Sequence, residues 1–111
     1  MEVNVSNNNY IITPLTPKLD ERETQRLKEE VLAAGEMPVG IDLSYVKECT
    51  VDFIDTVINT KNISLFNIPS DIFALLTFMN IDKNINLYVS ELDFLASKRR
   101  IVKRNFTLLA D

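Results

Sequence analysis

The sequence from Val39 to Ile58, VGIDLSYVKECTVDFIDTVI, sets the pattern for the rest of the chain. It opens within a short apolar run, Pro38–Leu43, and a run of that length bounded by Gly and Pro favours a buried strand over a helix. Polar residues follow. Thr50 then stands where a helix N-cap is expected, with Asp52 in the first turn. The stretch therefore predicts a buried strand, a polar turn and the start of a helix.

Upstream of this stretch, the chain predicts a β-hairpin. Glu2–Val5 alternates polar and apolar residues, three asparagines then supply turn residues, and Tyr10–Leu15 is largely apolar again. Pro14 and Pro17 end the second strand, because proline has no N–H to donate to a sheet.

A first helix is predicted between the hairpin and the buried strand. Asp20 and Glu23 form a capping-box pattern at its start, and Gly35 suits a left-handed cap at its end. The residues expected on its inward face are Leu27, Val31 and Leu32.

The second half of the chain alternates strands and helices. Ile63–Phe66 and Ile85–Val89 are predicted strands, Pro69 suits the first position of a helix, and Ser90 with Asp93 starts the last helix. The inward residues expected in the three helices are Ile54, Val57 and Ile58, then Ile72, Leu75, Leu76 and Met79, then Leu92, Leu95 and Val102. This order predicts one α/β domain over residues 1–111: a mixed sheet of four to five strands with the hairpin at its edge, and about four helices.

Composition excludes several classes of function. With 111 residues, 46% hydrophobic and 25% charged, the chain can bury one core. A net charge of −4 argues against broad electrostatic binding to nucleic acid or anionic membranes. The absence of histidine and the single cysteine exclude Cys/His zinc sites, an internal disulfide and catalysis by a histidine base. We expect no metal, no cofactor and, since neither a signal peptide nor a membrane-spanning run is present, a cytoplasmic protein.

In the order and spacing of its elements, the chain resembles the STAS domain family over residues 2–95. This is the fold of anti-sigma-factor antagonists, of a small subunit of a phospholipid-transport ABC system and of the cytoplasmic tails of sulfate transporters. The segments that carry the resemblance are Leu19-Asp20, Ile41-Asp42-Leu43-Ser44 with Val46, Ile68-Pro69, Leu75–Ile81 with Lys83, and Tyr88-Val89-Ser90. The resemblance implies a non-catalytic interaction module.

In the antagonist family, the central strand leads to an Asp-Ser-Ser-Gly turn whose first serine is phosphorylated by a partner kinase. The resemblance places Thr50, Val51, Asp52 and Phe53 at this turn. Valine has no hydroxyl to phosphorylate, and phenylalanine replaces the glycine. The helix that follows is also shorter than is usual in the family. This predicts a thinner cover on the sheet or an open apolar strip that another chain can occupy.

The resemblance implies a partner-binding surface on the turn and the helix start, formed by Lys47, Glu48, Thr50, Val51, Asp52 and Asp55. A fixed carboxylate at Asp52 or Glu48 would put negative charge where the family adds it by phosphorylation. Thr50 fits either a helix cap or a phosphoacceptor.

Two other features of this stretch have more than one interpretation. Asp52 and Asp55 fit solvated first-turn carboxylates, a phosphate mimic or an acid pair that lacks a second catalytic group. Cys49 is interpreted as a small buried residue rather than a reactive thiol.

The C-terminal segment 96–111 contains a basic cluster, formed by Lys98, Arg99, Arg100, Lys103 and Arg104. This cluster fits an acidic partner, an anionic lipid or nucleic acid, or the solvated end of a helix.

The leading hypothesis is a regulatory or scaffolding domain that binds an anti-sigma or serine-kinase-like protein through its turn, without a phosphoserine switch. The alternative is a subunit of a phospholipid-transporting ABC assembly, bound to its ATPase. In neither case do we expect an enzyme, a small-molecule substrate or nucleic-acid binding, and membrane contact would be indirect.

Overall fold

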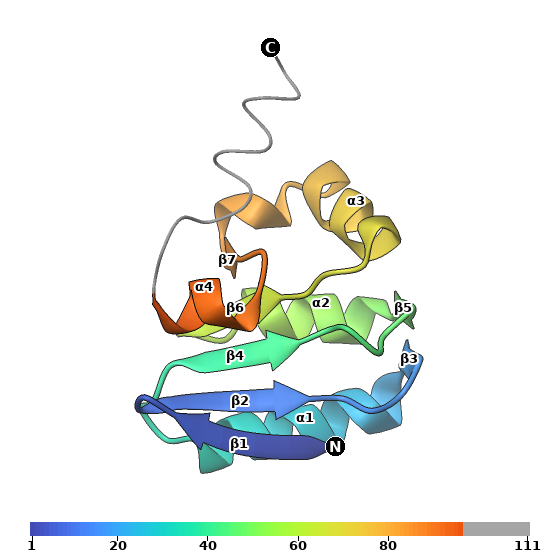
Figure 1. Ribbon diagram of the computed structural model, residues 1–111. Helices are drawn as coiled ribbons and strands as arrows, with labels where there is room; N and C mark the ends of the chain where they lie inside the picture. Colours follow the sequence, from blue (N-terminus) through green and yellow to red (C-terminus); the bar gives the residue numbers. More distant parts are fainter. Residues whose placement is uncertain (97–111) are drawn as a thin grey trace.

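The computed structural model describes residues 1–96 and contains a five-stranded sheet (Figure 1). In spatial order its strands are β1 (Glu2–Ser6), β2 (Asn9–Thr13), β4 (Val39–Asp42), β6 (Ile63–Phe66) and β7 (Asn86–Leu87). The first pair is antiparallel and all the others are parallel. A separate parallel pair joins β3 (Lys18–Leu19) to β5 (Glu48–Cys49). The mixed sheet with a hairpin at its edge confirms the prediction, whereas the β3–β5 pair was not predicted.

Four α-helices connect or follow these strands, as predicted: α1 (Glu21–Ala33), α2 (Val51–Ile58), α3 (Ser70–Phe78) and α4 (Glu91–Leu95), with a short 3₁₀ helix η1 (Ile81–Lys83) after α3. Within residues 1–96, none of the helices has the length and apolar character that crossing a membrane requires.

Local sequence signals set most of the boundaries. Asn7 and Asn8 both have positive φ, 52° and 63°, which makes the hairpin connection a two-residue type I′ turn. Asp20 Oδ1 accepts a hydrogen bond from Glu23 N at 3.0 Å, as the capping pattern predicts. The Glu23 carboxylate does not complete the box and instead pairs with Arg26 at 3.4 Å. Gly35 ends α1 in the left-handed region, at φ +66°.

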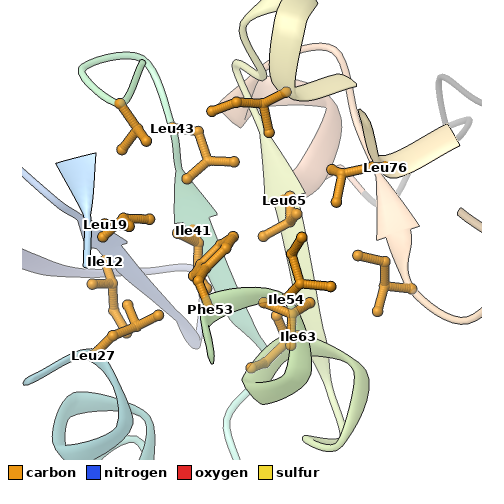
Figure 2. Packing of buried hydrophobic residues seen from close by; sticks show 14 of the residues in the cluster. Ile12, Leu19, Leu27, Ile41, Leu43, Phe53, Ile54, Ile63, Leu65 and Leu76 are labelled. Carbon is orange, nitrogen blue, oxygen red and sulfur yellow. The ribbon is translucent and has the colours of Figure 1, made fainter. Parts of the chain in front are cut away.

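The main core fills the space between the sheet and helices α1, α2 and α3 (Figure 2). Alternate residues of neighbouring strands, among them Ile12, Ile41 and Leu65, point into it and are fully buried. Leu27 from α1 and Phe53 from α2 pack against them and have no exposed surface. Phe53 thus holds α2 on the sheet through its ring.

A smaller aromatic cluster lies on the opposite face of the sheet, under α4. Phe94 stacks on Phe66 with ring centroids 5.6 Å apart and meets Tyr88 edge-on at 5.8 Å. Ile11 completes the cluster. Gly40 lies beneath it, and a Cβ at this position would come within 2.5 Å of the Phe94 ring. The absence of a side chain at residue 40 therefore lets α4 approach the sheet.

Several helix residues predicted to point inward are exposed instead, and these predictions were wrong. They are Leu32, Ile58, Leu75, Met79 and Leu92. Each helix buries a narrower stripe than its apolar pattern suggests, because a helix at the margin of a small sheet has a partner on only one side. The five-residue helix α4 buries Phe94, whereas Leu92 points to solvent.

Candidate docking surface

The loops that follow the parallel strands all lie along the edge of the sheet that is formed by the carboxyl ends of these strands. Figure 1 shows β2 and β4 ending on the same side as β3 and β5. Four apolar side chains on or next to these loops are largely exposed: Leu15 by 54%, Tyr45 by 59%, Val51 by 65% and Val89 by 53%. We call these four residues the docking surface.

Backbone hydrogen bonds tie the loop after β2 to the segment before α2. Pro17 O accepts from both Lys47 N, at 2.7 Å, and Glu48 N, at 3.0 Å. Lys18 and Glu48 also form an exposed ion pair at 3.8 Å, which contributes little to stability. Lys18 lies opposite Glu48 in the parallel β3–β5 pair, and Leu15 and Tyr45 each precede this pair by three residues, on neighbouring loops.

A polar network joins the loops after β4, β6 and β7. Asp42 Oδ1 accepts hydrogen bonds from Ser44 N at 3.0 Å and from Asn67 Nδ2 at 3.2 Å. Asn67 N in turn donates to Val89 O at 3.3 Å. Asn67 adopts φ +52°, a conformation that asparagine tolerates better than most residues. The network holds three loops in one arrangement and so fixes the positions of the apolar side chains that they carry.

Thr50 is the N-cap residue of α2, as predicted, but its hydroxyl does not cap the helix. Thr50 Oγ1 donates to Leu19 O at 3.2 Å, and Thr50 N donates to the same oxygen at 3.1 Å. The side chain therefore anchors the start of α2 to β3. A hydroxyl in this role is less accessible to a kinase than a free one.

The other predicted site residues fall on two adjoining regions. Lys47, Glu48 and Val51 are exposed beside the sheet edge. Asp52 and Asp55 are exposed as well, but they line a groove of about 490 Å³ between α1 and α2. The remaining residues of the groove are Lys28, Val31, Leu32, Thr56, Asn59 and Thr60. Val31 and Leu32, which belong to α1, give the groove an apolar wall.

Cys49 is half-buried against the main core, and burial raises the pKa of its thiol. A raised pKa lowers the thiolate fraction at neutral pH, and the thiolate is the nucleophile. We expect iodoacetamide to alkylate Cys49 of the folded protein more slowly than glutathione, and denaturant to remove the difference. Mass spectrometry of timed samples would measure both rates. Alkylation as fast as that of glutathione would contradict the interpretation of Cys49 as a packing residue.

Sequence reasoning missed most of the docking surface. Leu15, Tyr45 and Val89 follow strands and are apolar, so periodicity alone cannot separate them from strand residues that point inward. The positive φ of Asn67 could have been predicted, because asparagine tolerates this conformation and here directly follows a buried strand. The five basic residues from Lys98 to Arg104 lie outside the described residues.

Neither the family models nor the curated proteins include a match to this sequence. Among solved structures, an anti-sigma-factor antagonist (STAS) domain protein from Planctomyces limnophilus matches with a TM-score of 0.72. The two chains share 22% sequence identity, and the match covers 86% of this chain and 94% of the other. This chain has the STAS fold. The fold predicted from the order of elements is therefore confirmed.

Proposed function

We propose that this protein is a non-catalytic regulatory or scaffolding module that binds a partner protein through the docking surface. The observation that carries the proposal is the grouping of Leu15, Tyr45, Val51 and Val89, each more than half exposed, at one edge of the sheet. Exposed apolar residues that gather in one place mark interaction sites more often than scattered ones do. Tyrosine in particular is enriched among the residues that dominate binding energy.

The chemistry of the turn supports binding without a phosphoserine switch. Val51 has no hydroxyl, and the Thr50 hydroxyl is held by Leu19 O. Asp52 provides a permanent negative charge in the first turn of α2, where the helix dipole favours it. A module of this kind binds its partner constitutively, and its regulation comes from the partner or from expression.

The topology supports a binding role over catalysis. Open α/β sheets bind substrates where the strand order reverses, in a crevice between helices on opposite faces. From β2 to β7 the parallel strands of the described sheet follow one another in a single direction. The carboxyl edge of this sheet thus lacks the crevice that such enzymes use.

The proposal is tested by calorimetry with purified candidates encoded beside this chain, an anti-sigma-type serine kinase and an ABC ATPase. Val51→Glu and Tyr45→Ala should each weaken binding about 30-fold, which corresponds to about 2 kcal/mol. Leu92→Glu is the matched control, since Leu92 is also exposed but lies on α4, on the opposite face of the sheet. Equal affinities for all four proteins, or no binding to either candidate, would overturn the proposal.

A second test concerns the switch itself. We expect incubation with the serine kinase and ATP to leave the intact mass of this chain unchanged, because the turn offers no free hydroxyl. An antagonist protein that carries the Asp-Ser-Ser-Gly turn is the positive control for kinase activity. A mass increase of one phosphate that disappears in Thr50→Val would show a switch at Thr50 and contradict the constitutive mechanism.

A further inference from the structure

Strand β1 forms an open edge of the described sheet, on the side away from β7 (Figure 1). Sheet edges are usually protected by lysine, proline, a bulge or a very short strand. β1 has five residues, Glu-Val-Asn-Val-Ser, with neither lysine nor proline, and its pairing with β2 is continuous from Glu2 to Ser6. Val3 and Val5 are 37% and 54% exposed. The edge is therefore suited to pair with another strand.

The hairpin determines which backbone groups of β1 point outward. Tyr10 N donates to Pro38 O, so the backbone of Tyr10 faces β4, and the neighbouring residues Asn9 and Ile11 face β1. Their partners in the register are Ser6 and Asn4. The direction of the backbone hydrogen-bonding groups alternates along a strand. Ser6 and Asn4 face β2, so the N–H and C=O groups of Val3 and Val5 point away from the sheet.

We propose that β1 pairs with β1 of a second copy of this chain, antiparallel and centred on Asn4. In this register Val3 of each copy lies opposite Val5 of the other, so the outward backbone groups form two hydrogen-bonded pairs, each with two hydrogen bonds. The valine side chains of both copies lie on the same face as Tyr10 and Ile12, because residues opposite one another in the register share a face. The four valines then form one apolar strip across the joint.

Charge fits the same register. Glu2 carries the only charge of the strand, and it lies opposite the uncharged Ser6 of the other copy. The two Glu2 carboxylates are thus kept at opposite ends of the joint, where they do not repel one another strongly. The result is a symmetric dimer with a continuous sheet, an interface type in which each partner contributes the same surface. Its two docking surfaces lie at opposite ends, so the dimer can hold two partner molecules.

Oligomeric state and amide exchange of the full chain test the proposal. Sedimentation should give twice the monomer mass at high concentration, and exchange of the Val3 and Val5 amides should slow as concentration rises while that of Asn4 stays constant. Val5→Lys should abolish the dimer, since it places charge in the apolar strip. Val89→Lys should not, although Val89 is equally exposed. A monomer at every concentration would overturn the proposal. This holds also if the edge proves to be occupied by another part of the same chain.

The register is tested by a disulfide in a Cys49→Ala background. Asn4 lies on the symmetry axis as a non-hydrogen-bonded pair, so Asn4→Cys brings two Cα atoms within about 4.5 Å, inside the range that a disulfide requires. Mild oxidation should give a covalent dimer. Glu2→Cys should not crosslink, since its two copies lie roughly 14 Å apart. A dimer that is unaffected by Val5→Lys, or that crosslinks through residue 2 rather than residue 4, would place the interface elsewhere.

Discussion

Phe53→Gly is expected to unfold the protein or nearly so. It introduces the glycine that the resemblance to the antagonist family places at this position, but the Phe53 ring is fully buried between α2 and the sheet. Removing a buried phenylalanine side chain costs about 3–5 kcal/mol, and glycine inside a helix adds about 1 kcal/mol relative to alanine. This loss is comparable with the whole stability of a small domain, about 5–15 kcal/mol. Urea unfolding followed by circular dichroism would measure it.

Val51→Ser is the matched control for Phe53→Gly. It also introduces a residue of the family's turn, two positions earlier, but Val51 is 65% exposed. We expect a change in the free energy of unfolding within about 0.5 kcal/mol. A stable Phe53→Gly protein would mean that α2 can be held without its aromatic anchor.

Gly40→Ala is expected to destabilise the protein by displacing α4. The added methyl group would lie 2.5 Å from Phe94 Cε2 and 2.9 Å from Phe66 Cε2. The Phe94 ring cannot move aside easily, because it stacks on Phe66 and meets Tyr88. Overpacking of this kind costs about 1–3 kcal/mol. The free energy of unfolding in urea would measure the cost.

A double-mutant cycle identifies the cause. Phe94→Ala alone should cost about 3–5 kcal/mol, because Phe94 is 5% exposed and lies at the centre of the aromatic cluster. With Phe94→Ala already present, Gly40→Ala should cost much less than it does alone, because the clash has been removed. Additive costs would show that Gly40 is required for a reason other than the approach of α4.

Features of the chain that depend on neighbouring residues could be predicted from the sequence. The asparagine turn, the Asp20 cap and the Gly35 cap were predicted because a side chain or a positive φ acts within a few residues. The strands of the five-stranded sheet were predicted because short apolar runs between turn residues have few alternatives. Their order was then sufficient to indicate the STAS fold, which the structural match confirms.

The depth of burial on each helix could not be predicted in the same way. Leu75 and Met79 share an apolar stripe with Ile72 and Leu76, yet only the latter two are buried. The stripe marks the residues that are able to face a core, whereas the width of the contact depends on which elements lie beside the helix. Thr50 shows the same limit, because its hydroxyl bonds to Leu19, which is distant in sequence.

The sequence by itself determined the order of the strands and helices and most of the turn and cap residues. These follow from residue type and short-range geometry. Only the tertiary structure decided that Phe53 is an anchor, that Gly40 admits Phe94, and that Leu15, Tyr45, Val51 and Val89 remain exposed at one edge of the sheet. Each of these depends on contacts between segments that are far apart in the chain. The residues next to an apolar residue in the sequence do not show whether such a contact will bury it.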